Sequence, residues 1–121
     1  MLETLFGSVV REQVLLYILA RGEGYSREIA RFIDSGLDSV QKQLTRLSEG
    51  GVLARRKIGR TILFSFNDSY PFIVELKALL ESSLRLSSKP WAEELRIARS
   101  HRTNQGYSEP GYRRRRYKRG P

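Results

Sequence analysis

Two stretches of the chain concentrate positive charge in a pattern suited to binding a polyanion. Residues 39–60 contain six Lys or Arg residues and a single acidic residue, Glu49. Residues 87–121 contain ten Lys or Arg residues against three acidic ones. Such clusters attract polyanions and release their condensed counterions on binding. Because the remaining residues are slightly acidic, the formal net charge of +9 belongs to these two stretches.

The sequence offers little for catalysis or metal binding. The chain has no cysteine and one histidine, His101, which argues against disulfides, thiolate nucleophiles and cysteine-based metal sites. We find no nucleophile paired with a base, no metal-ligand set and no phosphate-binding glycine loop. We therefore expect a protein that is not an enzyme and that has no cofactor or metal.

Membrane and export signals are also not recognisable. No apolar run approaches the roughly 20 residues that a membrane-spanning helix needs. Residues 1–4 lack the basic start and apolar middle of a signal peptide. We expect a cytoplasmic protein without membrane contact.

Apolar periodicity predicts three helices in the first fifty residues. The first, residues 8–21, begins with Ser8, a residue suited to capping, and is followed by Gly22 and Gly24. A short second helix is expected to stop at Gly36. The third, residues 38–49, begins with Asp38 and Gln41 at the spacing of a capping box. Its apolar stripe, expected in the core, consists of Val40, Leu44 and Leu47.

Beyond residue 51 the pattern changes to that of strands. Residues 52–58 and 61–67 are strand-like, and Gly59 and Arg60 between them predict a tight turn. We therefore expect a β-hairpin. Its second strand alternates Ile62, Phe64 and Phe66 with Leu63 and Ser65, as in a strand with one face buried.

The C-terminal third is expected to be helical and then irregular. A helix is predicted over residues 71–86, with Pro71 in its first turn. A short extra helix is predicted within residues 91–101, and the composition after Thr103 predicts disorder. The predicted fold class is mainly α with a small β-hairpin, an extra C-terminal helix and a basic tail. We divide the chain into a domain, 1–86, and a basic extension, 87–121.

The third helix and the hairpin combine polar and basic side chains as a DNA-binding surface does. A helix fits the major groove of B-DNA, and basic residues beside it neutralise phosphates. Lys42 and Arg46 form a like-charge i, i+4 pair that costs about 0.2–0.5 kcal/mol in an isolated helix, which a polyanion partner explains better than helix stability. The alternatives are a solvated helix face and an edge strand protected by charge. Gln41 has its own alternative, the capping box.

A resemblance to a known family adds to this interpretation. Residues 26–30, 39–47, 51–53 and 55–61 are similar to the winged helix-turn-helix domain of ArsR-like transcriptional regulators, and the resemblance extends over residues 2–85. Residues 5–11 and the segment 67–72 resemble more closely the small winged-helix domains associated with nucleotidyltransferases. The resemblance implies a winged helix-turn-helix fold. Many ArsR-like proteins sense metals through Cys or His ligands, which this chain lacks, so we do not expect that scheme here.

The resemblance also implies which residues bind duplex DNA. It assigns to the major groove Ser39, Gln41, Lys42, Gln43 and Arg46, and Thr45 lies on the same predicted face. It assigns to the wing Arg55, Arg56, Lys57 and Arg60. We add an arginine run with neighbouring tyrosines in the tail, which suits phosphate contacts and stacking on bases: Arg113, Arg114, Arg115 and Arg116. The resemblance further implies a homodimer formed through the first helix and the helix at residues 71–86.

The sequence thus favours a DNA-binding transcriptional regulator, and two alternatives remain. One is a protein-interaction module that regulates a separate enzyme, such as a nucleotidyltransferase, whose catalytic domain this chain does not contain. The other is an RNA-binding protein that uses its Arg- and Tyr-rich tail.

Overall fold

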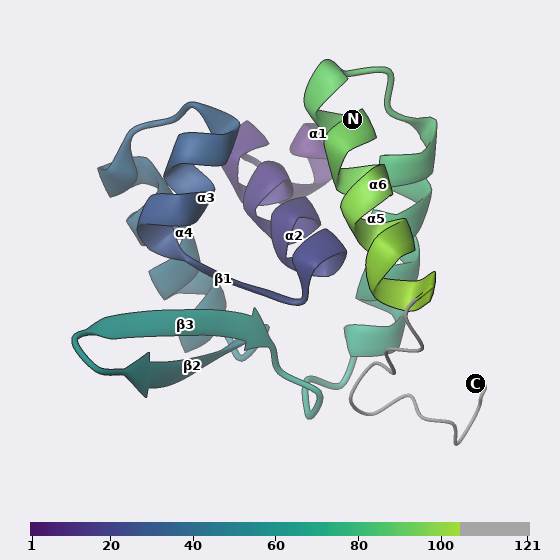
Figure 1. Ribbon diagram of the computed structural model, residues 1–121. Helices are drawn as coiled ribbons and strands as arrows, with labels where there is room; N and C mark the ends of the chain where they lie inside the picture. Colours follow the sequence, from purple (N-terminus) through teal and green to yellow (C-terminus); the bar gives the residue numbers. More distant parts are fainter. Residues whose placement is uncertain (105–121) are drawn as a thin grey trace.

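The computed structural model describes residues 1–104 of the chain (Figure 1). The helices in this range are α1 (Glu3–Phe6), α2 (Val9–Arg21), α3 (Ser26–Ile33), α4 (Leu37–Glu49), α5 (Ile73–Leu86) and α6 (Pro90–Asn104). The strands are β1 (Glu23–Tyr25), β2 (Leu53–Ile58) and β3 (Thr61–Phe66).

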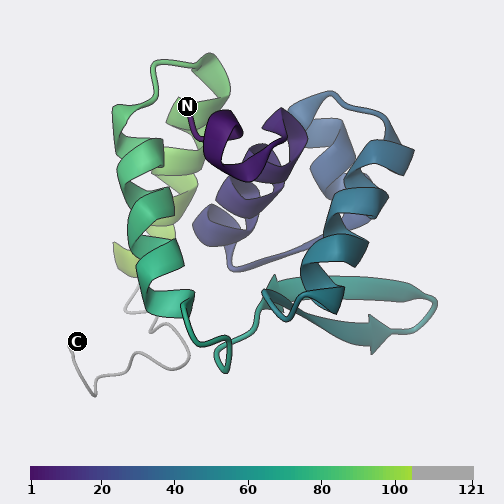
Figure 2. The ribbon, with the colours of Figure 1, turned by 180° about the vertical axis from the view of Figure 1, so that it is seen from behind.

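Helix α2 lies at the centre of the fold. Every residue from Val14 to Ala20 is buried, which explains why this part of the sequence is apolar on all sides. The helix contacts all the other helices and both β1 and β3. Helices α3 and α4 lie on one side of it, α5 and α6 on the other, and the β2–β3 hairpin extends beneath α3 and α4 (Figure 1, Figure 2). The Ser8 side chain caps α2, as predicted, by accepting from the Arg11 N–H at 3.1 Å.

The three strands form an antiparallel sheet in the order β1-β3-β2. The predicted hairpin is confirmed: Ile58 pairs with Thr61 across a two-residue turn, in which Gly59 has a φ of +60°. The sequence did not predict β1, which pairs with β3. Leu63 and Phe64, neighbours in β3, are both buried, so both faces of this central strand are covered there, and the expectation of one buried face is wrong.

The turn between α3 and α4 differs from the prediction. Helix α3 ends at Ile33 and is closed by Asp34, whose φ of +54° lies in the left-handed region. The predicted stop, Gly36, instead precedes α4 as its N-cap residue. Asp38 therefore lies inside the first turn of α4 and makes no capping hydrogen bond, so the predicted capping box is wrong and Gln41 is not engaged in one. The predicted core stripe of α4 is confirmed, since Val40, Leu44 and Leu47 are buried.

Helices α5 and α6 run side by side in opposite directions (Figure 1, Figure 2). Helix α5 begins at Ile73, two residues later than predicted, and Pro71 precedes it. The predicted extra helix is present as α6 and is longer than expected. Its Ala92 and Leu95 are fully buried in the same apolar cluster as α2, so α6 is part of the core.

Three arginines of α6 donate hydrogen bonds to backbone carbonyls at the C-terminal ends of neighbouring helices. Arg96 donates to the Leu84 and Ser87 carbonyls at 2.9 Å, at the end of α5. Arg99 and Arg102 both donate to the Leu19 carbonyl, at 3.3 and 2.7 Å, near the end of α2. These carbonyls have no partner within their own helix and carry the negative end of its dipole. Part of the positive charge of residues 87–121 therefore stabilises the fold.

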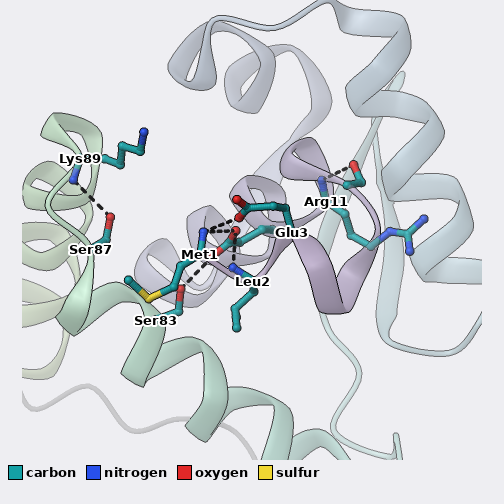
Figure 3. A network of polar contacts seen from close by, with 9 residues as sticks. Met1, Leu2, Glu3, Arg11, Ser83, Ser87 and Lys89 are labelled. Carbon is teal, nitrogen blue, oxygen red and sulfur yellow. Dashed lines mark hydrogen bonds and ion pairs between the residues drawn. The ribbon is translucent and has the colours of Figure 1, made fainter.

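A buried carboxylate joins α1 and α5 to α2. Glu12, only 4% exposed, accepts from the Leu2 N–H at 3.0 Å and from the Ser83 hydroxyl at 2.9 Å (Figure 3). The Met1 amino group lies 3.2 Å from the same carboxylate. A buried charge needs such partners to offset its lost hydration. The contacts fix where α1 and the last turn of α5 lie against α2.

Candidate nucleic-acid interface

Helix α4 presents one polar face to the outside. Because its apolar stripe packs against the core, the opposite face is left to solvent. The exposed predicted contact residues on this face are Ser39, Gln41, Lys42, Thr45 and Arg46. The structure therefore places five of the six predicted α4 residues on an accessible surface.

Gln43 is the exception. Its side chain is 9% exposed, and its Oε1 accepts from the Arg11 Nε at 2.8 Å. Gln43 is three residues after Val40 and four before Leu47, so its side chain lies on the buried face of α4. There it points toward Arg11 of α2 rather than outward. The expectation that it faces a groove does not fit this position, and we leave Gln43 out of the interface.

The basic residues of the β2–β3 hairpin divide between the two faces of the sheet. Arg55 pairs with Phe64 and lies, with Arg60 of the turn, beside α4. Lys57 shares the face of Arg55 because side chains alternate along a strand. Arg56 points to the opposite face, where its guanidinium is 3.9 Å from the Glu23 carboxylate. Three of the four predicted hairpin cations thus join the surface of α4, and Arg56 does not.

A hollow of about 430 Å³ lies between α4, the sheet and the start of α3. It is lined by Tyr25, Ser26, Arg27, Gln41, Thr45, Arg55, Arg60, Thr61, Ile62 and Phe64. None of these residues is acidic, and the start of α3 contributes the positive end of a helix dipole. The hollow therefore combines three arginines with the positive end of the α3 dipole, a setting that favours an anion.

Tyr25, Ser26 and Arg27 were not predicted from the sequence as members of this site. Ser26 and Arg27 entered the prediction only within residues 26–30, a segment that carries the family resemblance. The signal that could have found Arg27 is its place in the first turn of the helix that precedes the predicted DNA-reading helix, since the first helix of such a pair crosses the DNA backbone.

The cations of this surface are free of competing carboxylates. Among residues 1–104, no ion pair involves Arg27, Lys42, Arg46, Arg55 or Arg60. In contrast, Arg96 and Arg99 of α6 pair with Glu93 and Glu81. Charge on the α4 surface therefore remains available to an external anion, whereas charge on α6 is largely used within the protein.

Other kinds of site are not evident in the described part of the chain. Residues 1–104 contain no group of three or more His, Asp or Glu side chains placed to hold a metal ion. No helix among them is long and apolar enough to cross a membrane. The predicted tail contacts at Arg113, Arg114, Arg115 and Arg116 lie outside the described residues.

Comparison with known proteins identifies the fold. No protein-family profile and no curated protein sequence matches the chain. Among solved structures, it is similar to HlyU from Vibrio cholerae, with 22% identity, a TM-score of 0.56, and coverage of 73% of this chain and 86% of HlyU. It is also similar to AntR, an antimony-specific transcriptional repressor, with 21% identity, a TM-score of 0.53, and coverage of 69% of this chain and 74% of AntR.

A third similar structure is itself a winged helix-turn-helix domain. Mb0332 from Mycobacterium bovis is a homodimeric winged helix-turn-helix DNA-binding domain of a possible ArsR-family regulator. It is 22% identical, with a TM-score of 0.52, over 73% of this chain and 79% of that domain. The chain has a winged helix-turn-helix fold. Helices α3 and α4 form the helix-turn-helix and the β2–β3 hairpin is the wing, which confirms the predicted fold class.

Proposed function

We propose that the protein is a transcriptional regulator that binds duplex DNA through α4 and the wing. One observation carries the proposal: the polar face of α4, the wing and the start of α3 enclose a single hollow with three arginines and no acidic residue. A winged helix-turn-helix domain presents its second helix and its wing to DNA. In this chain those two elements carry Lys42, Arg46, Arg55 and Arg60, none of which forms an ion pair among residues 1–104.

The parts of the surface suit different contacts. Helix α4 suits the major groove, where Gln41, Lys42 and Arg46 have the donors and acceptors that read base edges. Arg27, Arg55 and Arg60 suit phosphates, which position a protein on the duplex without reading sequence. The arginine-rich tail would add affinity that does not depend on sequence. Arg56 is not part of this proposed interface.

The proposal includes a homodimer formed through α1 and α5. The first helix expected in this role, residues 8–21, is α2, which lies mostly buried in the core, so α1 takes its place in the proposal. Phe72, Leu79 and Leu86 are 62%, 38% and 63% exposed and occur seven residues apart, so they follow one stripe along α5. Beside this stripe lies an apolar hollow of about 350 Å³, to which Phe6 of α1 contributes. Exposed apolar surface of this kind marks an interaction site. A second copy of the chain would cover it symmetrically, as in most soluble oligomers.

Selection of bound duplexes from a random pool at physiological salt tests this function. An enriched palindrome would support a dimeric regulator, and its affinity relative to a random duplex gives a discrimination ratio. Lys42→Ala with Arg46→Ala should lower this ratio, because base contacts specify and phosphate contacts do not. Lys89→Ala, an exposed lysine between α5 and α6, is the matched control.

Two outcomes would contradict the proposal. Preference for structured RNA over duplex DNA in direct competition would favour the RNA-binding alternative. Absence of nucleic-acid binding, together with stable co-purification of an enzyme, would favour the regulatory-module alternative. Equal loss of affinity for selected and random DNA in the Lys42 and Arg46 variant would move both residues to the phosphate-contact class.

A further inference from the structure

A single guanidinium connects three helices at the inner side of α4. Arg11 of α2 is half-buried, and its Nε donates to Oε1 of Gln43 in α4 at 2.8 Å. Its Nη1 donates to the Phe6 carbonyl at the end of α1, also at 2.8 Å. Both acceptors are neutral oxygens, and among residues 1–104 Arg11 forms no ion pair. One side chain thus sets the relative placement of α1, α2 and α4.

The inner face of α4 is otherwise apolar. Gln43 is the one polar residue of α4 that is buried with Val40, Leu44 and Leu47. Apolar contacts are non-directional and tolerate small rotations of a helix. A buried hydrogen bond does not tolerate such a rotation, because it would leave the donor and the acceptor without partners. The contact between Arg11 and Gln43 therefore defines the orientation of α4 more narrowly than packing alone.

Arg11 also borders the proposed dimer surface. It lines the apolar hollow of about 350 Å³ together with Phe6, Phe72 and Leu79. The neighbouring residue, Glu12, joins α1 to Ser83 of α5. Two consecutive residues of α2 therefore link the helices of the proposed dimer surface to the inner face of α4.

We propose that Arg11 and Gln43 are a positioning pair that orients α4 for reading DNA, although neither residue touches DNA. This inference rests on the proposed function. It assigns to Gln43 a role through Arg11, in place of a contact with bases. The two roles predict different effects of the same substitutions.

Gln43→Glu separates the two roles. A carboxylate keeps the acceptor for Arg11 and makes the hydrogen bond charge-assisted. It would repel the phosphate-rich duplex if residue 43 touched DNA. Under the positioning role, Gln43→Glu retains the discrimination ratio of the wild type, whereas Gln43→Leu, which removes the acceptor, loses it. Under direct contact, Gln43→Glu is the more damaging change.

The experiment measures the affinity of the full chain for the selected duplex and a random duplex at several salt concentrations. We expect Gln43→Leu and Arg11→Met each to lower the discrimination ratio roughly tenfold, within the range of couplings between contacting residues. The double variant should lose no more than either single variant, because the two residues act as one unit. The slope of affinity against salt should stay constant, since the number of phosphate contacts does not change.

Gln13→Leu is the matched control, the same chemical change at a half-buried position of α2, and should leave the ratio unchanged. Circular dichroism verifies that each variant is folded. If Gln43→Leu does not fold, Arg11→Lys replaces it: a lysine keeps the charge but loses the planar fork, and should also lower the ratio.

Equal discrimination by the wild type, Gln43→Leu and Arg11→Met overturns the inference. Additive losses in the double variant, or a larger loss for Gln43→Glu than for Gln43→Leu, also overturn it. Failure of the proposed function looks different, because then the wild type itself selects no duplex.

Discussion

Replacing Arg55 and Arg60 of the wing with alanine should change how DNA affinity depends on salt. Both residues are exposed, line the hollow beside α4 and form no ion pair among residues 1–104, so each is available for one phosphate. Each phosphate contact contributes about −0.9 to the slope of log affinity against log salt. Loss of two contacts should therefore reduce the steepness of the slope by about 1.8.

This change has a measurable size. Between roughly 50 and 200 mM salt, one contact accounts for about a 3.5-fold fall in affinity and two contacts for about a 12-fold fall. The Arg55→Ala, Arg60→Ala variant should thus lose about 12-fold less affinity over this range than the wild type. Fluorescence anisotropy with a labelled random duplex, titrated at four or more salt concentrations, is a suitable assay because the expected effect does not depend on sequence.

Arg56→Ala is the critical comparison. It removes the same side chain from the same strand, but Arg56 lies on the opposite face near Glu23. We expect its slope to equal that of the wild type. An equally reduced slope for Arg56→Ala, or an unchanged slope for the double variant, would refute the placement of DNA on the α4 side of the wing.

Three further predictions concern the dimer and the core. Leu79→Glu should convert a dimer to monomers in sedimentation velocity, because it places a carboxylate in the apolar stripe of α5. Val74→Glu, on another face of α5, should leave the dimer intact. A dimer that is unchanged in both variants would exclude this interface. Gly24→Ala should lower the free energy of unfolding in urea by about 1–3 kcal/mol, because a Cβ would lie 3.0 Å from Tyr17 and Ile29; an unchanged midpoint would contradict the close approach of β1. Burial, then the charge of Glu28, raises the pKa of Tyr17 to about 12. Since the unfolded chain ionises this phenol from about pH 10, stability should fall between pH 10 and 12, and tyrosinate absorbance at Tyr17 near pH 10 in the folded protein would contradict this.

Features that depend on local periodicity could be predicted from the sequence. The stripe of Val40, Leu44 and Leu47 repeats with the period of a helix, and the two-residue turn at Gly59 and Arg60 is specified by neighbouring residues. The exposed face of α4 follows from its buried face. These elements contain most of the predicted site.

Features that depend on distant partners could not be predicted. Strand β1 has only three residues, and it exists because it pairs with β3 about forty positions later. Asp34 takes the left-handed conformation usually filled by glycine, which made Gly36 the more obvious helix stop. Gln43 has a polar side chain, which predicts exposure, but it is buried because Arg11, 32 residues earlier, supplies its hydrogen-bond partner.

Positive charge illustrates the same limit for function. By composition, residues 87–121 are the most basic part of the chain, yet three of their arginines bind helix carbonyls or nearby carboxylates. The wing and α4 have fewer cations, but apart from Arg56 none of them forms an ion pair within the described residues, and Arg55 and Arg60 line one hollow. An anion gains most where cations are already fixed and unneutralised, since no internal ion pair has to be broken first. The location of unpaired charge, rather than its total amount, is therefore the better argument that DNA lies against α4 and the wing.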